Sequence, residues 1–152
     1  MSLVGMRHAL SSPQTQVAAG LAIAVPSVPI IALLKMASYL DRPPERERDL
    51  SDLAHVVNEY PPADDDRLFE SGIAERGLTL ETAMPFVLGR ELAALTDAAE
   101  AAVVRRFLQR VRSSDLGRFV ANGPWSTFEP EQAESRLDAL ELGFGSVGEP
   151  RR

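Results

Sequence analysis

The sequence contains no cysteine at all, and this absence excludes several classes of site. Disulfide bonds, zinc sites with thiolate ligands and catalysis by a thiol all need cysteine. Histidine is nearly as scarce, with His8 near the start and His55 far from it along the chain. Two isolated histidines disfavour a metal site, and His55, which has apolar neighbours, is predicted to lie in the core or at its rim. No serine stands in a Gly-x-Ser-x-Gly sequence, so an acyl-transfer triad has no support.

The sequence also has fewer positively than negatively charged residues, and its apolar runs are interrupted. Against 22 acidic residues the chain has 16 lysines and arginines, and its net charge is -6. Such a chain is not expected to coat nucleic acid or an anionic membrane through a broad basic surface. The most apolar stretch, Val17–Leu34, is interrupted by two prolines and is too broken for a membrane-spanning helix. The first residues carry Arg7 and no clear cleavage signal, so we expect a soluble, cytoplasmic protein without membrane contact.

What the sequence does contain is helical periodicity in a chain of single-domain size. With 152 residues, 45% of them hydrophobic and 25% charged, one domain with its own core is expected. We predict a mostly α fold, a compact bundle of about five or six helices with a short N-terminal strand. The expected organisation is a loose segment over residues 1–16, a single helical domain over residues 17–142 and a flexible tail over residues 143–152.

The first third of the chain predicts one strand and two helices. Leu21–Val25 is typical of a short strand, and two prolines turn the chain after it. Apolar residues at helical spacing then predict a helix over Ile30–Asp41, and a second helix is predicted over Arg46–Tyr60. The diproline between them restricts the residues that precede it, so the two helices should form a hairpin with a short, stiff loop.

Further helices are predicted in the middle of the chain. Asp64–Asp66 form an acidic start for a short third helix, which continues through Phe69 to about Ile73. Thr79 is the predicted N-cap of a fourth helix, in which Thr82 stands where a capping box would have Glu or Gln. The predicted inward face of this fourth helix consists of Leu80, Met84, Val87, Leu88, Leu92 and Leu95.

The last part of the chain predicts two more helices around an irregular region. A fifth helix is predicted over Asp97–Val111 and a last amphipathic helix over Glu129–Leu142. Between them, Ser113–Thr127 contains two glycines and a proline, which predict an irregular region with Trp125 as its anchor. The inward face of the fifth helix is predicted to consist of Val103, Val104, Phe107, Leu108 and Val111.

The predicted helical hairpin carries the most specific polar pattern. Lys35 directly follows the apolar stripe of the first helix, and Asp49 and Asp52 are three residues apart in the opening turns of the second. Residues at this spacing share one helical face, so hairpin formation brings both carboxylates toward the lysine. Two interpretations stay open. Either the three residues form a salt bridge that holds the hairpin together, or the lysine contacts a phosphate beside a carboxylate that deprotonates an attacking hydroxyl.

The same stretch resembles a known enzyme family. IALLKMASYLDRPPERERDLSDLAHVV is similar to the lysine and aspartate motifs of the AbiEii/AbiGii-toxin-like nucleotidyltransferases, in which a strand and a Pro-containing turn lead to a helix of the form LLKLxAxxDR. MPFVLGRELAAL resembles a segment of a later helix in many members. The resemblance covers residues 21–112 and implies that the chain is the C-terminal part of an α+β nucleotidyltransferase-like fold.

The resemblance implies a role for each polar residue of the hairpin. Lys35 corresponds to the lysine that contacts phosphate, Asp49 to the acid that activates the acceptor hydroxyl, and Asp52 to an accompanying aspartate. Arg42 and Arg48 correspond to supporting cations that bind the substrate. The family transfers a nucleotide from an NTP to an acceptor, in some toxins a tRNA end, with Mg2+.

One part of the family pattern is missing from this sequence. Members carry a Gly-Ser turn and metal-binding strand carboxylates ahead of the lysine helix, whereas the 34 residues before Lys35 contain no Asp or Glu. Uncharged side chains cannot replace carboxylates around Mg2+, so no metal site is predicted in this chain. Asp64–Asp66 are not expected to replace the missing metal ligands, because consecutive residues do not alternate along a strand as a metal-binding pair would. The GxGxxG pattern over residues 143–148 lacks the strand and helix that should surround it.

Two functions of different class follow from these observations. The first is a truncated or split nucleotidyltransferase-like protein of the AbiEii toxin type, part of a toxin–antitoxin system, which needs a separate N-terminal half and is inactive as this chain alone. The second is a non-catalytic helical interaction module, in which Lys35 and its aspartates only brace the hairpin. Without partner strands Leu21–Val25 would expose apolar surface, which predicts a homodimer or a complex with another chain. Catalysis requires Lys35 and Asp49 to face each other at a cleft open to solvent.

Overall fold

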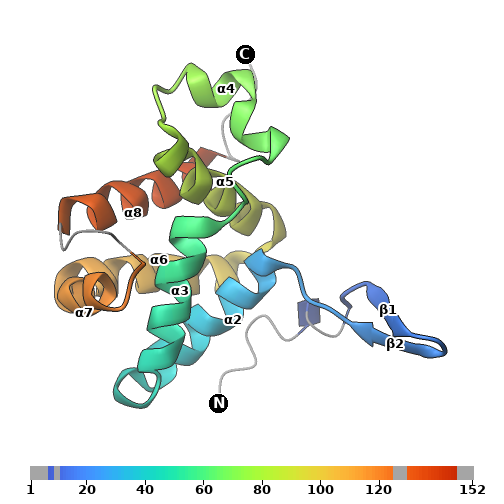
Figure 1. Ribbon diagram of the computed structural model, residues 1–152. Helices are drawn as coiled ribbons and strands as arrows, with labels where there is room; N and C mark the ends of the chain where they lie inside the picture. The colour runs from blue at the N-terminus through green and yellow to red at the C-terminus, as the bar shows by residue number, and fades with distance from the viewer. Residues whose placement is uncertain (1–6, 9–10, 125–129, 147–152) are drawn as a thin grey trace.

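The computed structural model describes residues 7–8, 11–124 and 130–146, and most of its regular structure is helical (Figure 1). The predicted fold class, mostly α with a short strand region near the N-terminus, is confirmed. The strands and α-helices are β1 (Gln14–Ala18), β2 (Leu21–Ala24), α2 (Val28–Asp41), α3 (Glu47–Glu59), α4 (Ser71–Ala74), α5 (Leu80–Leu95), α6 (Ala98–Arg110), α7 (Leu116–Ala121) and α8 (Pro130–Gly145). Within these described ranges, no helix combines the length and the apolar character that crossing a membrane requires.

The most extensive contact between two helices joins α5 and α8 (Figure 1). Residues 83–89 of α5 are all buried, so this helix is covered on several sides rather than on one face. Two glycines permit the close approach. A Cβ atom on Gly89 would lie 2.0 Å from the carbonyl oxygen of Leu140, and one on Gly143 would lie 2.0 Å from that of Phe86. The tail predicted to begin at residue 143 is therefore wrong for residues 143–145, which complete α8; residues 147–152 lie outside the described ranges.

The other long helices pack around this pair through one main apolar cluster. The inward face predicted for the fifth helix is confirmed, because all five of its side chains are buried. The ring of Tyr39 on α2 packs edge-to-face against Phe107 of α6, with ring centroids 6.1 Å apart. Burying side chains of this size contributes roughly 1.5–3 kcal/mol each. The cluster thus holds α2 firmly against α6 and sets the direction in which the polar residues of α2 project.

The predicted helical hairpin is confirmed as α2 and α3. α2 begins at Val28, two residues earlier than predicted, with Pro29 in its first turn, where a helix makes no use of the missing N–H. It ends at Asp41 as predicted, and the diproline that follows forms a 3-10 turn over Pro43–Glu45 that returns the chain into α3. The face of α3 that packs into the core consists of Leu50, Leu53, Ala54 and Val57.

The strand region is larger than predicted. Leu21–Ala24 does not stand alone but pairs antiparallel with Gln14–Ala18, which lies partly in the segment predicted to be loose. Gly20, with a φ of 77°, occupies the turn between the strands in the left-handed conformation that glycine favours. The first strand was not predicted because its residues are mostly polar, so it lacks the apolar run that indicated a strand at Leu21–Val25.

The region predicted to be irregular is largely helical where it is described. Val111–Asp115 forms a π-helix, and α7 follows directly and buries Phe119 and Val120. Gly117 does not interrupt this helix and lies on its exposed side. Trp125, the predicted anchor, lies outside the described residues.

Two helix starts also differ from the prediction. The acidic segment leads into a 3-10 turn over Asp66–Phe69 and then into the single turn of α4, rather than into one continuous short helix. At the start of α5 the hydroxyl of Thr82 accepts a 2.9 Å hydrogen bond from the backbone N–H of Thr79. Thr82 therefore accepts the capping-box hydrogen bond that Glu or Gln usually accepts. Leu80, predicted to face inward, is exposed in the first turn of this helix.

Candidate functional site

Lys35 reaches across the helical hairpin to both predicted aspartates. Its Nζ atom donates a 3.1 Å hydrogen bond to Oδ1 of Asp49 and a 2.6 Å hydrogen bond to Oδ2 of Asp52. The lysine projects from the middle of α2, and the two aspartates come from the first turns of α3, where their spacing places them on one face. The structure thus brings these three sequence-predicted residues together, and we call them the Lys35 cluster.

The Lys35 cluster lies at the surface rather than in the core. The exposed fractions of the side chains are 26% for Lys35, 14% for Asp49 and 43% for Asp52. Burial alone would lower the pKa of the Lys35 ammonium, but the hydrogen bonds with Asp52 and Asp49 outweigh it and raise this pKa above its usual value. The lysine is therefore a cation at neutral pH, suited to holding an anion and not to accepting a proton.

Each member of the cluster has a different capacity for further contacts. An ammonium has three N–H donors, and Lys35 donates two of them to carboxylates, so one remains for another acceptor. Oδ2 of Asp49 is buried and accepts no hydrogen bond from the described residues, although Nη1 of Arg46 lies 3.8 Å away. Asp52 is the most exposed of the three and offers its second oxygen to solvent.

The two arginines predicted to support substrate binding do not join the cluster. Arg42 is exposed, and its Nη1 lies 3.4 Å from Oε2 of Glu45 within the hairpin loop. Arg48 is exposed on α3 and makes no ion pair with any residue in the described ranges. Arg46, which sequence reasoning passed over, is the arginine that approaches Asp49. Its spacing of three residues from Asp49 was the signal that could have identified it.

A second polar network lies deeper, and no sequence pattern indicates it. The hydroxyl of Tyr39 donates a 2.8 Å hydrogen bond to Oδ2 of Asp115, and Nε of Arg110 donates one of 2.7 Å to the same oxygen. Nη1 of Arg118 lies 3.5 Å from the other oxygen of Asp115, and its Nε lies 3.5 Å from Oε1 of Glu47 on α3. We call these residues the Tyr39 network. Asp115 could not be found because it lies in the stretch predicted to be irregular.

The environment of the Tyr39 network differs from that of the Lys35 cluster. Tyr39 and Asp115 are both buried. Burial, followed by the hydrogen bond with Asp115, raises the pKa of the Tyr39 hydroxyl above its usual value. The π-helix over Val111–Asp115 carries the carboxylate, and such π-turns recur at functional sites. The acceptor oxygens of Asp115 are already engaged, however, so the network braces α2 against the segment between α6 and α7.

Other charged groups pair with one another and stabilise local structure. Glu100 at the start of α6 is buried and is bound by Arg7 and His8. Burial opposes its charge, but the hydrogen bonds from Arg7, from the backbone of Asp97 and from His8 prevail and lower its pKa to about 2. The N-terminal segment is thereby fastened to the capping box of α6.

The acidic segment predicted to be a helix cap also pairs with an arginine. Asp65 accepts hydrogen bonds from the backbone and side chain of Arg67, which lower its pKa to about 2. Arg67 also binds Glu91, and Tyr60 donates a 2.7 Å hydrogen bond to that same glutamate. His55, predicted to lie in or beside the core, is instead exposed on α3, with Nδ1 2.9 Å from the carbonyl oxygen of Ser51. None of these groups points to a ligand.

The described residues do not fit a divalent cation. Among them, no three His, Asp or Glu side chains lie close enough together to hold a metal ion. Asp49 and Asp52 are the nearest candidates, but the ammonium of Lys35 occupies the position between them that a cation would take. No step involving Mg2+ can therefore be assigned to these side chains.

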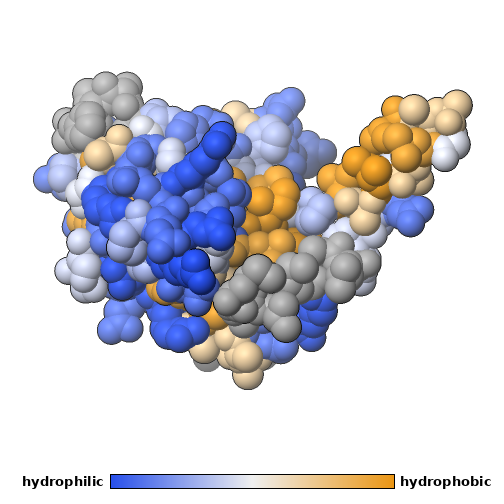
Figure 2. All heavy atoms as spheres, turned by 90° about the horizontal axis from the view of Figure 1, so that it is seen from below, coloured by the Kyte–Doolittle hydropathy of each residue, from blue (hydrophilic) through white to orange (hydrophobic). Residues whose placement is uncertain are grey.

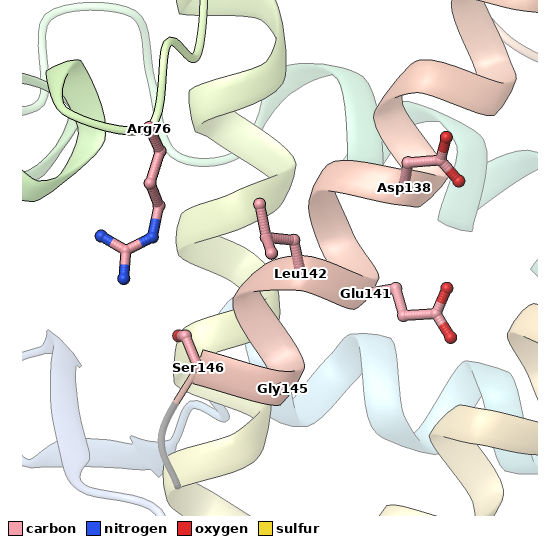
Figure 3. Close-up of a pocket in the computed structure, with 6 residues that line it drawn as sticks. All are labelled: Arg76, Asp138, Glu141, Leu142, Gly145 and Ser146. Carbon is pink, nitrogen blue, oxygen red and sulfur yellow. The ribbon is translucent and has the colours of Figure 1, made fainter. Parts of the chain in front are cut away.

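A surface pocket lies on α8, and it contains none of the predicted site residues (Figure 3). Asp138 and Glu141 project from α8 away from Arg76, and Arg112 binds both carboxylates. The two pocket carboxylates are thus neutralised by Arg112. The pocket is lined by Arg76, Asp138, Glu141, Leu142, Gly145 and Ser146.

Comparison of the chain with protein-family models, with curated proteins and with solved structures finds no match.

Proposed function

We propose that this chain is the helical portion of a nucleotidyltransferase-like protein of the AbiEii toxin type, with Lys35 and Asp49 at its reaction site. One observation supports the proposal above the others: Lys35 Nζ lies 3.1 Å from Asp49 Oδ1 across the hairpin. The family likeness of the sequence requires this pairing, and both side chains keep some access to solvent. The required cleft is not supplied by the pocket on α8, whose lining includes neither residue. The AbiEii relationship itself rests on the sequence resemblance.

In this proposal Lys35 binds the triphosphate of the incoming nucleotide. Its charge is maintained by the two carboxylates, and its third N–H is available to a phosphate oxygen. A lysine acts on phosphate as a point charge. Such a cation stabilises the negative charge that develops on the transferred group. The exposed Arg42 and Arg48 flank the same end of the hairpin and would attract the nucleotide before it binds.

Asp49 takes the proton of the acceptor hydroxyl in the proposed reaction. The freed oxygen forms a bond to the α-phosphorus, and the bond from that phosphorus to the bridging oxygen breaks, so pyrophosphate leaves with the bonding electron pair. Asp52 holds the ammonium in place beside the base through its 2.6 Å hydrogen bond. The acceptor can be a tRNA end, by analogy with some toxins of the family.

The metal chemistry of such a transfer would have to come from outside these helices. The 34 residues that precede Lys35 carry no carboxylate, and the described carboxylates do not fit Mg2+. A partner segment outside this sequence, with a Gly-Ser turn and strand carboxylates, would supply the metal ligands. Nucleotide transfer is thus expected only when that partner is present, whereas contact between Lys35 and a triphosphate is expected in the chain alone.

The triphosphate contact can be tested directly, because Lys35 is the only lysine of the sequence. Protein labelled with [ζ-15N]lysine gives a single side-chain ammonium signal, which should shift in a saturable way when inorganic tripolyphosphate is added. Lys35→Arg should keep tripolyphosphate binding in calorimetry and Lys35→Met should lose it. A matched control is Arg105→Met, which removes a cation on α6 that lies over the ring of Phe144 and is not part of the Lys35 cluster. An ammonium signal that tripolyphosphate leaves unmoved would refute the assigned role of Lys35.

Transfer itself is tested with a labelled NTP and total tRNA, with and without a candidate partner that carries the missing carboxylates. Asp49→Asn should abolish labelling, because the amide cannot take the acceptor proton. Asp52→Asn should retain part of it, since its role is to position the lysine. Equal activity of Asp49→Asn and the unaltered chain would remove Asp49 from the mechanism.

The second candidate function is a non-catalytic interaction module. The observation in its favour is that both hydrogen-bonded carboxylates already neutralise Lys35, as a simple brace requires. If the chain is such a module, Lys35→Met should lower the melting temperature. Neither the unaltered chain nor any variant should bind tripolyphosphate. The two functions therefore differ in the ammonium titration and not in the stability measurement.

A further inference from the structure

The hairpin of β1 and β2 stands away from the helical body (Figure 1). Every residue of both strands is exposed, so no described part of the chain covers either face. Four large apolar side chains are about half exposed in this arm: Val17 at 52%, Leu21 at 53%, Ile23 at 45% and Val25 at 43%. Figure 2 shows the same projecting arm as a mostly hydrophobic surface beside a largely hydrophilic body.

The strand register places three of these apolar side chains on one side of the arm, and Val17 lies at the irregularity between Gln16 and Ala18. Residues two apart in a strand share a face, so Leu21, Ile23 and Val25 point the same way. The pairing of Thr15 with Ile23 puts Thr15 on this side, whereas Gln16 pairs with Ala22 on the opposite side. We call the side with Leu21, Ile23 and Val25 the apolar face of the arm. The other side carries glutamine and alanine side chains.

An arm of this kind needs a covering surface. A two-stranded sheet is at best marginally stable alone in water, and it gains stability when its apolar face packs against something else. The helical body does not supply that surface, since the strands pair only with each other. The apolar face is therefore left uncovered by the described residues.

The charge distribution favours a second copy of this chain as the occupant. No residue between His8 and Lys35 is ionisable, although the whole chain carries a net charge of -6. Contact between two helical bodies would bring like charges together, whereas contact between two arms would not. A flat, uncharged apolar face is also complementary to itself, as a two-fold symmetric contact demands.

We propose that two copies of this chain form a dimer by packing the apolar faces of their arms together. Leu21, Ile23 and Val25 of each copy contact their counterparts across a two-fold axis, as two small sheets stacked face to face. The helical bodies, with their Lys35 clusters, remain on the outside of this dimer. The inference does not depend on the nucleotide chemistry proposed above, and its failure would leave that chemistry untouched.

The test measures the mass of the intact chain in solution. Sedimentation equilibrium should give about twice the 16.5 kDa of one chain at ~100 μM, where a micromolar contact is saturated. Ile23→Lys places a charge on the apolar face and should reduce the species to one chain. Gln16→Lys introduces the same residue into the same hairpin on the opposite face and should leave the dimer intact. Circular dichroism verifies that both variants keep the helical fold.

A charge-complementation experiment separates the proposed contact from damage to the arm. Ile23→Lys and Ile23→Glu should each be monomeric alone, and their equimolar mixture should form a mixed dimer, because the two side chains meet across the axis. An unaltered chain that sediments as a monomer overturns the proposal, as does an Ile23→Lys variant that still dimerises. A monomeric chain that binds neutral phosphatidylcholine vesicles through Ile23 would assign the face to a lipid surface and overturn the dimer.

Discussion

Lys35 and Tyr39 leave α2 one turn apart, and the structure places them in opposite settings. Lys35 stays at the surface and hydrogen bonds to carboxylates 14 and 17 residues along the chain. Tyr39 enters the core and hydrogen bonds to Asp115, 76 residues away. The Lys35 cluster keeps a spare donor and contact with solvent, whereas the Tyr39 network has its acceptor oxygens occupied. The comparison separates a surface group that joins two neighbouring helices and keeps a free donor from a buried group that joins segments far apart in the chain.

Removing the carboxylate of the Tyr39 network should have the largest effect on stability. Asp115→Ala leaves the buried Tyr39 hydroxyl without its acceptor and Arg110 without its partner. Leaving a buried hydroxyl without its partner lowers stability by about 2 kcal/mol, whereas the partly exposed Arg110 can be hydrated by solvent. Urea denaturation followed by circular dichroism measures the loss. If Asp115→Ala proves as stable as the unaltered chain, the network is not the brace described here.

Removing only the hydroxyl of Tyr39 should have a smaller effect. Tyr39→Phe keeps the ring against Phe107 and leaves Asp115 with its hydrogen bond from Arg110. The expected loss in the free energy of unfolding is about 1 kcal/mol. A double-mutant cycle with Asp115→Ala isolates the coupling between the two side chains. Strictly additive losses would show that the 2.8 Å hydrogen bond contributes nothing measurable.

Removing the ammonium should have a smaller effect still. Lys35→Met keeps the aliphatic stem beside the hairpin and leaves Asp49 and Asp52 close together without a cation. A partly exposed ion pair contributes roughly 0.5–1 kcal/mol, and Lys35→Arg should restore most of it. Thermal unfolding of the three proteins measures the difference. A loss greater than that of Asp115→Ala would reverse the comparison between the two sites.

The smallest expected effect is the pH dependence of the stability that Lys35 contributes in the alkaline range. The pKa of Lys35 is raised in the folded chain above its ordinary value of 10.5. Its stabilising contribution is therefore complete below that value and is lost as the pH rises through the folded pKa. The difference in melting temperature between the unaltered chain and Lys35→Met should be constant from about pH 7 to about pH 10 and should shrink above it. A difference that vanishes near neutral pH would contradict the charged state assigned to Lys35.

The Lys35 cluster could be predicted from the sequence because everything that builds it is local. Helical periodicity fixed the faces of α2 and α3, the diproline forced a short return, and the spacing of Asp49 and Asp52 placed both on the side of the lysine. The Tyr39 network could not be predicted in this way. Its parts come from separate helices, and nothing in the chain between them specifies which carboxylate meets the hydroxyl.

The errors in the predicted fold have the same cause. Gln14–Ala18 is mostly polar and lacks the apolar run that indicated the strand at Leu21–Val25, so its pairing with β2 became visible only in three dimensions. Gly143 suggested a flexible end, yet a glycine in that position is what allows α8 to touch the backbone of α5 at Phe86. Glycine thus marks a turn in one setting and a close helix contact in another, and the sequence does not distinguish them.

The sequence by itself determined the mostly α class, the helical hairpin and the lysine with two aspartates that spans it, because each depends on periodicity and on residues close along the chain. Only the tertiary structure decided that Asp115 binds Tyr39, that Arg42 and Arg48 stay apart from Lys35, and that the β arm is left uncovered. Those outcomes depend on how distant apolar surfaces pack, and packing selects among many local arrangements that the sequence allows equally.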